Sequence, residues 1–408
     1  MKRVWILNHY AGTPDNSIGL RHYNFAKKLI ARGYDVTVFA ASTLHGTDRN
    51  LITDNRPYVK DDSSGVPFVY IKARDYSGNG KARVLNMLDY YFGVKKCVKD
   101  FPKPDIIYAS SVHPLTVLAG TDLKKRYHCR LVSEFRDLWP ESLLDFGGMS
   151  PKSPIVIALY KLEHYLYKKA DALIFTQQGG ADYIANKGYK GVDPEKIYYI
   201  NNGVDLKTFN KNCDENAYYD SDLDDEKTFK VVYAGTVRKA NNLGSLIKAA
   251  EKLKDCEAIK FLIFGIGEDR ESLEAFCIEN GINNVIFKGS VKKSTVPYVL
   301  SKSNLNILNY HKASIWRYGG SQNKLFEYLA SGKPVCANVK IAYSPIDEYG
   351  CGVSENLDTP EEFAAAIRSI YELPQAEYEK MCENARRAAC EFDFEKLTDR
   401  LVKALEAE

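Results

Sequence analysis

The chain has 408 residues, of which 45% are hydrophobic and 27% charged, and its formal net charge at pH 7 is +3. This length predicts more than one domain and a large buried core, and the nearly balanced charge argues against nucleic acid as a partner. The longest apolar runs fall short of the roughly 18 to 20 residues that span a bilayer, so membrane contact, if any, would be peripheral.

The first half of the chain alternates strands with helices. Helical spacing predicts helices at residues 20–32, at 82–99 and after Pro114. Apolar and β-branched runs predict strands at residues 2–8, 34–40, 68–71, 106–109, 131–134 and 172–176. Because strands that alternate with helices form a parallel sheet covered on both faces, we expect a doubly wound, Rossmann-like α/β domain over residues 1–203.

Residues 204–228 interrupt this alternation and are rich in acidic residues, so we predict a linker there. A second α/β series follows over residues 229–375. Its predicted strands are residues 230–234, 260–264, 285–288, 305–308 and 334–337. Two such domains facing a cleft would place the ends of both sheets around one ligand. Residues 376–408 are predicted to be helices that close the chain and cross back to the N-terminal domain.

The cysteines and the N-terminus indicate the compartment. The nine cysteines are scattered, with no CxxC pair and no Cys/His spacing typical of a metal site, so we expect reduced thiols and no bound metal. The opening MKRVWILNHY is too short in apolar residues for a signal peptide, which predicts a cytoplasmic protein.

A Gly-Gly turn followed by a helix is the most informative segment of the sequence. The free amides of a turn and of a helix start favour an anion such as phosphate, which would lie against Gly319, Gly320, Ser321 and Asn323. Lys324 and Glu327 share one helical face, where the lysine could hold phosphate and the glutamate sugar hydroxyls. The alternative is an ordinary helix that begins with a solvated ion pair.

Further candidate groups follow other predicted strands. Arg238 and Lys239 after Gly235 suit a pyrophosphate, although a solvated basic turn would look the same. Glycines permit close approach of the backbone to a ligand. A GxG pair or a loop after a strand is therefore weak evidence for a ligand-binding position. The remaining candidate binding positions are Gly12, Gly19, Gly267 and Val291.

Two strand ends in the first half carry groups that could act on a substrate. His113 follows an apolar strand directly, where a neutral imidazole could hydrogen-bond a sugar hydroxyl, although a lone histidine is often structural. Asp137 or Glu134, in EFRDLWPE, could accept a proton from a nucleophilic hydroxyl. The alternative is a salt bridge from Arg136 that braces the loop. No phosphate-loop, HExxH or GxSxG motif is present.

Taken together, several motifs resemble those of the bacterial family four glycosyltransferases, which have the two-domain GT-B fold. They are NHYAGTP, GYDVTVF, SSVHPL, EFRDLWPES, INNGVD, YAGT and NKLFEYLASGKPV. The set is most similar to the subfamily that builds O-antigen and capsule repeat units. The resemblance implies transfer of a sugar, with retention and without a metal or other cofactor, from a nucleotide donor that is typically UDP-linked to a saccharide on a polyprenyl diphosphate.

The resemblance also implies roles for particular residues. Glu327 matches the family glutamate that binds the nucleotide ribose, and His113 matches the histidine that touches the donor sugar. The family's first glutamate falls on Gly319 here, so the amides of residues 319–323 would replace it. The family's basic pair falls near Thr236 and Asn241, neither of which is basic, so Arg238, Lys239 and Lys324 become the candidates for the pyrophosphate clamp.

Residues 81–103 and 155–169 mix apolar and aromatic side chains with lysines. Such segments suit helices in the interface of the inner face of the cell membrane, although core helices with solvated basic edges are an equal alternative. Two other functions share this architecture. A non-hydrolysing UDP-sugar epimerase would need no acceptor, and a two-lobe sugar-binding protein would carry out no reaction.

Overall fold

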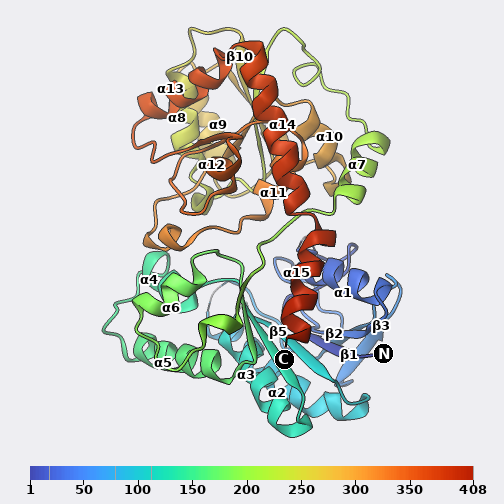
Figure 1. Ribbon diagram of the computed structural model, residues 1–408. Coiled ribbons are helices and arrows are strands. Elements are labelled where there is room, and N and C mark those ends of the chain that lie inside the picture. Colours follow the sequence, from blue (N-terminus) through green and yellow to red (C-terminus); the bar gives the residue numbers. More distant parts are fainter. Residues whose placement is uncertain (18, 79, 112, 408) are drawn as a thin grey trace. The chain divides into compact units, whose positions relative to one another are not determined.

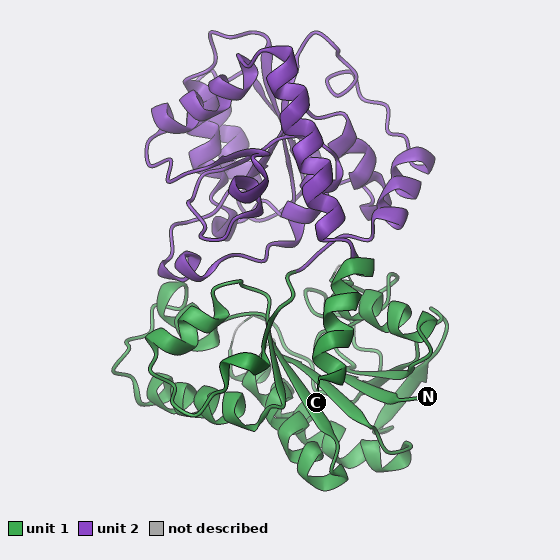
Figure 2. Cartoon of the chain, in the orientation of Figure 1, with its two compact units in different colours: residues 1–201, 394–408 green, residues 202–393 purple. Residues whose placement is uncertain are grey.

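The computed structural model describes residues 1–17, 19–78, 80–111 and 113–407, so Ile18 and Val112, which lie in two of the predicted loops, fall outside the described residues. The chain forms two compact units (Figures 1 and 2). Unit 1 comprises residues 1–201 and 394–408, and unit 2 comprises residues 202–393. Each unit is a largely parallel sheet with helices on its faces, which confirms the predicted α/β class.

The sheet of unit 1 has the strand order β3-β4-β2-β1-β5-β6-β7-β8. Neighbouring strands are parallel except for β3 and β4, whose pairing is antiparallel. The strands are β1 (Arg3–Leu7), β2 (Asp35–Ala41), β3 (Tyr58–Asp61), β4 (Phe68–Ile71), β5 (Ile106–Ser111), β6 (Arg130–Phe135), β7 (Ala172–Phe175) and β8 (Ile197–Tyr199).

Helices cover both faces of this sheet. They are α1 (Arg21–Ala31), α2 (Lys81–Cys97), α3 (Pro114–Tyr127), α4 (Trp139–Asp145), α5 (Pro154–Lys169), α6 (Gly180–Asn186) and α15 (Phe394–Glu406). The core lies between helices and sheet, where Trp5 and Phe39 are fully buried with ring centroids 5.3 Å apart. Burying one such side chain contributes roughly 1.5 to 3 kcal/mol, which explains why the apolar runs become the central strands.

The helix α15 belongs to unit 1 although it follows unit 2 in the chain. Its Phe394 ring packs edge-on against Phe25 of α1, with centroids 5.2 Å apart. On the same helix pair, Lys28 Nζ lies 2.5 Å from Glu395 Oε1 and Arg32 lies 2.7 Å from Asp399 Oδ1. The last helix therefore completes the layer that α1 begins.

The sheet of unit 2 is parallel throughout, in the order β11-β10-β9-β12-β13-β14. Its strands are β9 (Phe229–Ala234), β10 (Ile259–Phe264), β11 (Val285–Gly289), β12 (Leu305–Leu308), β13 (Val335–Ala337) and β14 (Gly352–Ser354). Its helices are α7 (Leu206–Glu215), α8 (Leu243–Glu251), α9 (Arg270–Glu279), α10 (Val296–Ser301), α11 (Asn323–Ala330), α12 (Pro345–Tyr349), α13 (Pro360–Tyr371) and α14 (Gln375–Glu391).

Residues 204–228, for which the sequence predicts a linker, fold as part of unit 2. Asp205 caps α7 by accepting a hydrogen bond from Thr208 N at 2.7 Å, and Phe209 of that helix is buried. Lys288 Nζ lies 2.6 Å from carboxylate oxygens of both Asp220 and Asp222. Three of the acidic residues that suggest a solvated linker therefore cap a helix or form ion pairs within unit 2.

A buried carboxylate in unit 1 is surrounded by tyrosine hydroxyls. Glu163 of α5 is 5% exposed and accepts hydrogen bonds from Tyr167 at 2.9 Å and from Tyr183 and Tyr189 at 2.8 Å each. Burial raises its pKa from 4.5 to about 7, although the three hydroxyls favour the charged form.

This shift predicts a pH-dependent stability that glutamine would abolish. Between pH 4.5 and 7 the folded protein keeps a proton on Glu163 that the unfolded chain has lost, so stability falls as the pH rises through this window. Because glutamine does not titrate, the free energy of unfolding of Glu163→Gln should rise by roughly 2 to 3 kcal/mol relative to that of the parent chain between pH 5 and pH 8. Urea denaturation at both pH values measures this gain, and an equal difference at the two would contradict it.

Candidate active site

In unit 2, a lysine from α11 reaches the carboxyl end of the central strand β9. Lys324 Nζ donates a hydrogen bond to the hydroxyl of Tyr233 at 2.7 Å and lies 4.4 Å from the centre of that ring. Gly235 follows β9 at this point, and a Cβ there would clash with Cε and Nζ of Lys324. Glycine is therefore required at position 235 for the ammonium group to occupy the strand end.

The electrostatic setting of Lys324 favours an anion beside it. The pKa of Lys324 is lowered from 10.5 to about 7, mainly by burial and also by the positive charge of Arg238, while Glu327 opposes the shift. Close to neutrality the amine is therefore only partly charged. A bound diphosphate would favour the ammonium form by direct charge pairing.

The turn before α11 is held by hydrogen bonds from the beginning of unit 2. Asn202 donates from its backbone N to Ser321 Oγ at 3.2 Å and from Nδ2 to Ser321 O at 2.6 Å. Gly319 is buried with φ of 100°, a left-handed conformation that favours glycine. Asn323 is exposed at the first position of α11. Ser321 and Gly319 thus shape the turn, and the first turn of α11 retains its positive dipole end.

The glutamate of α11 lies beside a second loop. Glu327 is partly exposed, and its carboxylate forms an ion pair with Lys293. Lys293 follows the loop that carries Val291, so this contact brings two of the predicted binding segments together. Sequence reasoning identified the loop but not Lys293 as the partner of Glu327, because the two residues are 34 positions apart.

The basic turn after β9 has an anchored backbone and exposed side chains. Arg238 and Lys239 are both exposed. His311 Nε2 lies 2.8 Å from the carbonyl oxygen of Lys239 and donates to it, and Asn309 Nδ2 donates to Asn241 O at 3.0 Å. The fixed backbone presents both cations to solvent on the side of the sheet where Lys324 lies.

Gly267, predicted to approach a nucleotide, is needed for contact between two loops. Its φ is 159°, and a Cβ would clash with the carbonyl oxygen of Val237. In the same contact, Val237 N donates to Ile266 O at 3.0 Å. The neighbouring Gly265 meets the carbonyl of Gly235 in the same way. These glycines let the loops after β9 and β10 pack backbone to backbone, which supports the position of Arg238.

In unit 1, the predicted histidine is fully buried in a chain of polar groups. His113 lies just before α3 at its N-cap position, and its Nε2 is 3.0 Å from Nδ1 of His9. The Nε2 atom of His9 is in turn 2.7 Å from Oδ1 of Asn86. Burial lowers the pKa of His9 to about 3 and the pKa of His113 well below its usual range. Both imidazoles are therefore neutral at physiological pH.

Glu134, one of the two carboxylates predicted as a proton acceptor, is a structural group. It is fully buried, and Arg21 lies 2.5 Å from Oε1 while His22 lies 3.0 Å from Oε2. Tyr108 donates to Oε1 at 2.5 Å and Ser110 to Oε2 at 2.6 Å. Despite its burial, these partners hold the pKa of Glu134 well below its usual range. A carboxylate with its lone pairs occupied and no access to solvent is not available as a base.

Asp137, the other candidate, is exposed after β6. Crowding by surrounding atoms raises the pKa of Asp137 and Arg136 opposes this rise, but its contact with solvent limits the effect. It borders a recess of about 20 Å³ that Ser111 and Pro114 also line. This volume is far too small for a sugar ring, so Asp137 is reached from the surface.

The glycine-containing loop after β1 is held by hydrogen bonds between its own residues. Thr13 N donates to Asn16 Oδ1 at 2.8 Å, and Gly19 N donates to Ser17 Oγ at 3.2 Å. A Cβ on Gly12 would clash with Asn16 and Ser17. The amides of Thr13 and Gly19 are thus used inside the loop, and the absence of a side chain at Gly12 allows the loop to pack closely.

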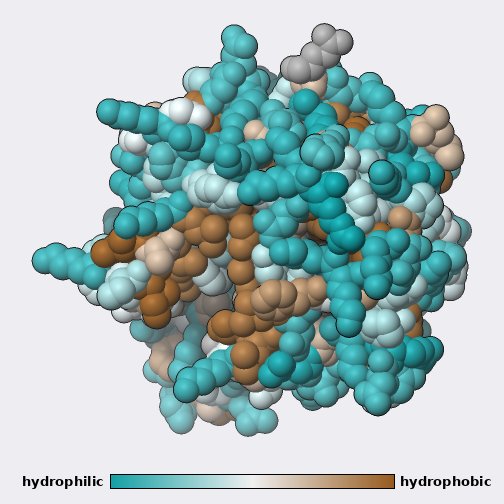
Figure 3. All heavy atoms as spheres, turned by 90° about the horizontal axis from the view of Figure 1, so that it is seen from below, coloured by the Kyte–Doolittle hydropathy of each residue, from teal (hydrophilic) through white to brown (hydrophobic). Residues whose placement is uncertain are grey.

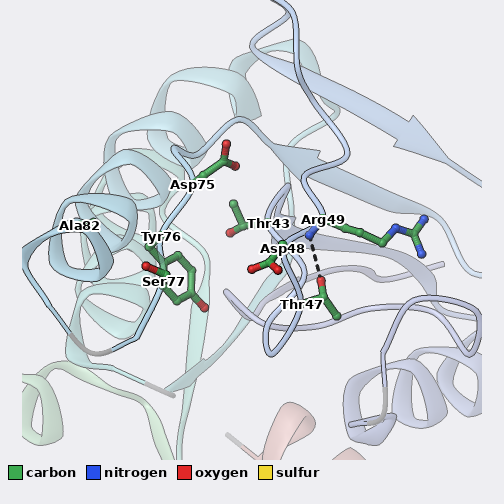
Figure 4. Close-up of a pocket in the computed structure, with 8 residues that line it drawn as sticks. All are labelled: Thr43, Thr47, Asp48, Arg49, Asp75, Tyr76, Ser77 and Ala82. Carbon is green, nitrogen blue, oxygen red and sulfur yellow. Dashed lines mark hydrogen bonds between the residues drawn. The ribbon is translucent and has the colours of Figure 1, made fainter.

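A polar cavity that the sequence did not reveal lies at the ends of β2 and β4. Its volume is about 360 Å³. Figure 4 shows the side chains of Thr43, Asp48, Asp75 and Tyr76 around one space, whereas that of Arg49 points away from it. Thr47, Ser77 and Ala82 complete the lining. Hydroxyls and carboxylates beside an aromatic ring are groups that hydrogen-bond and stack on saccharides.

Comparisons with known proteins agree with this arrangement. Residues 21–208 match the family model Glycosyltransferase Family 4, and residues 215–388 match Glycosyl transferases group 1. The chain is 21% identical over 377 residues to "Probable glycosyltransferase WbjE" of Pseudomonas aeruginosa, covering 91% of this chain and 90% of the relative. It is 24% identical over 198 residues to the colanic acid biosynthesis glycosyl transferase WcaI of Escherichia coli (strain K12), covering 46% of each.

Among solved structures, Anabaena Alr3699/HepE in complex with UDP has a TM-score of 0.72 and 15% identity, with 100% of both chains covered. This similarity shows a shared GT-B fold. The two family models follow one another along the chain and leave only short segments unmatched. The chain therefore belongs to the glycosyltransferases, with a family 4 domain followed by a group 1 domain.

Proposed function

We propose that this glycosyltransferase takes a UDP-sugar as donor and a polyprenyl-diphosphate-linked saccharide as acceptor in the synthesis of a bacterial surface polysaccharide. The proposal rests on Lys324, whose amine is held at the end of β9 beside Gly235 and near Arg238. It is supported by the UDP complex of HepE and by the relative named for colanic acid biosynthesis.

The diphosphate gains negative charge as the sugar departs. Lys324, Arg238, Lys239 and the dipole of α11 offset this charge, and one such donor stabilises a transition state by roughly 2 to 4 kcal/mol. Glu327 accepts hydrogen bonds from the ribose hydroxyls. Because three cations are available for the diphosphate, we propose that no metal takes part. Activity should then survive EDTA, and its loss, restored by a divalent cation, would refute this.

In the proposed reaction the acceptor hydroxyl attacks the anomeric carbon on the side from which the diphosphate leaves. The new bond joins the acceptor oxygen to that carbon, the bond from carbon to phosphate oxygen breaks, and the hydroxyl proton passes to the departing diphosphate. Retention of configuration follows from attack on this side. Asp137 is exposed and orients the acceptor hydroxyl. The cavity lined by Asp48, Asp75 and Tyr76 holds the acceptor sugar.

A panel of donors with and without acceptor tests the reaction. The purified chain is given UDP-glucose, UDP-galactose, UDP-N-acetylglucosamine or GDP-mannose, each with and without a polyprenyl diphosphate that carries one N-acetylhexosamine. We expect transfer from one UDP-sugar only when the acceptor is present, and NMR of the product should show the anomeric configuration of the donor. Isomerisation of the donor without acceptor would refute the proposal in favour of an epimerase, and an inverted product would refute retention.

Replacing Glu327 by alanine should weaken donor binding. Loss of the ribose contacts removes charge-assisted hydrogen bonds of about 1.5 to 3 kcal/mol, so the KM for the donor should rise roughly tenfold or more. Lys293→Ala is the matched control because it breaks the same ion pair while leaving the carboxylate in place. Initial rates over a range of donor concentrations measure the effect, and an unchanged KM in Glu327→Ala would show that the ribose lies elsewhere.

Unit 1 carries the surface that we assign to the membrane. Figure 3 shows apolar side chains gathered on one face of the molecule among hydrophilic ones. On α2, Phe92 is 62% exposed, and on α5, Ile155 is 61% exposed. Lys161, Lys168 and Lys169 of α5 are exposed too, whereas Lys95 of α2 is paired with Asp122 at 2.6 Å. None of the described helices is long and apolar enough to cross a bilayer.

Reversing the lysine charges on α5 should weaken membrane binding. Each lysine near an anionic surface contributes about 1 kcal/mol, so changing Lys161, Lys168 and Lys169 to Glu should lower partitioning roughly a hundredfold or more. Co-sedimentation with phosphatidylglycerol vesicles at low salt measures this partitioning. The control changes Lys207, Lys211 and Lys227 of unit 2 to Glu, which alters net charge equally. Equal losses in both triple variants would refute a specific membrane face.

A further inference from the structure

A chain of hydrogen bonds in unit 1 joins the polar cavity to His113. Thr43, which lines the cavity, accepts a hydrogen bond at Oγ1 from Nδ2 of Asn86 at 3.1 Å. The chain continues through His9 to His113 by the contacts of 2.7 Å and 3.0 Å described above. All four side chains are buried, so water does not compete for their hydrogen bonds.

The direction of every bond in this chain follows from Asn86. Its Nδ2 also lies 2.5 Å from the carbonyl oxygen of Arg74, which can only accept, so this end of the amide carries the hydrogens. Its Oδ1 therefore accepts from Nε2–H of His9. A neutral His9 then has a lone pair on Nδ1, which accepts from Nε2–H of His113. Since both imidazoles are neutral, Nδ1 of His113 carries no proton.

This unprotonated nitrogen has no hydrogen-bond partner in the described part of the chain. The same is true of Oγ1 of Thr116, which lies three positions along in the first turn of α3. Both residues are 0% exposed. Buried polar groups in proteins are almost always hydrogen-bonded, so two unpaired ones in a single helical turn indicate a place for a ligand hydroxyl.

We propose that Asn86 and His9 are positioning residues that fix His113 in the tautomer with the proton on Nε2, so that Nδ1 accepts a hydrogen bond from a hydroxyl of the transferred sugar. The identity of that ligand rests on the proposed function, whereas the tautomer does not. The arrangement selects for a sugar whose hydroxyl donates. A fluorine or a methoxy group at the same carbon offers no proton and loses the bond.

Nitrogen NMR of the full chain labelled with 15N-histidine tests the tautomer without any ligand. The spectra separate protonated from unprotonated ring nitrogens, and the signals of His113 are those that disappear in His113→Asn. We expect Nε2 of His113 to be protonated and Nδ1 to be unprotonated at pH 7.5. A protonated Nδ1, or a mixture of the two tautomers, would overturn the inference.

Variants separate positioning from simple packing. In His9→Asn the side-chain oxygen can take the place of Nδ1 as acceptor, so His113 should keep its tautomer, whereas His9→Leu should release it. If His9→Leu does not fold, Asn86→Leu removes the acceptor of His9 Nε2–H instead and should release the tautomer in the same way. An unchanged His113 spectrum in both leucine variants would refute the role of His9 and Asn86.

Addition of ligand tests the hydroxyl contact. UDP alone should leave the Nδ1 signal of His113 in place, and the UDP-sugar that the panel selects should shift it without protonating it. His9→Leu should lower kcat/KM about tenfold, with less than about threefold change in His9→Asn. His164, whose Nε2 contacts Lys190 O at 2.8 Å, provides the control His164→Leu, which should have no effect.

A shift of the Nδ1 signal by UDP alone would refute the sugar contact. If no nucleotide sugar binds, the proposed function fails, but the tautomer seen in the ligand-free chain still decides the inference about His9 and Asn86.

Discussion

Lys324→Ala should lower kcat/KM about 10²- to 10³-fold, more than any other single substitution in unit 2. In the proposed mechanism the lysine supplies a positive charge at the point where charge develops on the leaving diphosphate, and the loss of one such preorganised donor has an effect of this size. The ammonium lies over the ring of Tyr233 and beside Gly235, whereas the side chains of Arg238 and Lys239 are exposed. Steady-state rates with the UDP-sugar of the panel measure the loss.

Lys302→Ala is the matched control. Its Nζ also lies over a tyrosine ring, 5.5 Å from the centre of Tyr298. However, Lys302 precedes β12 and therefore lies at the amino ends of the strands, opposite to Lys324. This variant should retain the parent activity. Comparable losses in Lys302→Ala and Lys324→Ala would mean that charge or folding of unit 2, rather than the strand-end position, determines the rate.

The pKa of Lys324 also predicts how UDP binding depends on pH. Below pH 7 the ammonium form predominates, so titration of this amine should change the affinity by less than about twofold as the pH falls from 7 to 6. Above pH 7 the free protein loses this proton and must regain it on binding, so affinity should fall by up to about tenfold for each pH unit. Calorimetry in buffers of different ionisation enthalpy should detect proton uptake at pH 8, and this uptake should disappear in Lys324→Ala.

Glu134→Ala should destabilise unit 1 by about 3 to 5 kcal/mol, because removing one partner of a buried ion pair leaves the other charge uncompensated. Arg21 is 4% exposed and would lose its carboxylate partner, while it keeps its hydrogen bonds to the carbonyl groups of Ile200 and Asn201. The pKa of Glu134 lies well below its unfolded value, so this stabilisation is present at neutral pH and is lost only as the pH falls toward the folded pKa.

An ion pair at the surface of the same unit provides the comparison. Arg74 lies 2.6 Å from Asp89, with side chains 50% and 27% exposed. Asp89→Ala should cost no more than about 1 kcal/mol, because solvent screens this pair. Urea denaturation of both variants, followed by circular dichroism, measures the difference. If Glu134→Ala cost no more than Asp89→Ala, the buried cluster would not contribute to stability as described.

The sequence predicted the architecture where local pattern and tertiary burial agree. The strands β5 and β10 are apolar runs that the sheet buries, so their positions could be predicted within a few residues. The helix α7 could not, because its sequence is polar and its stability depends on the Asp205 cap and on the burial of one phenylalanine. The antiparallel strand β3 was missed for a similar reason, since none of its four residues is fully buried.

The candidate site was predictable only in part. A turn followed by a helix, with Lys324 and Glu327 on one face, is a local pattern, whereas the contact of Lys324 with Tyr233 at the end of β9 joins residues 91 positions apart. The functions of His9 and Asn86 depend on contacts over 104 and 77 positions in the chain, which no local pattern encodes. Gly267 was predicted from a glycine pair alone, and its close approach to the carbonyl of Val237 gives that glycine a packing function as well.

The return of α15 to unit 1 determines the order in which the chain can complete its folding. Synthesis proceeds from the N-terminus, so α1 emerges early but waits for Phe394 and Glu395, which follow all of unit 2. Unit 2 has every one of its residues available earlier, at Asp393. The unit that the ribosome begins first is thus the one that it finishes last, and the part of α1 that packs against Phe394 stays uncovered while the second unit is made.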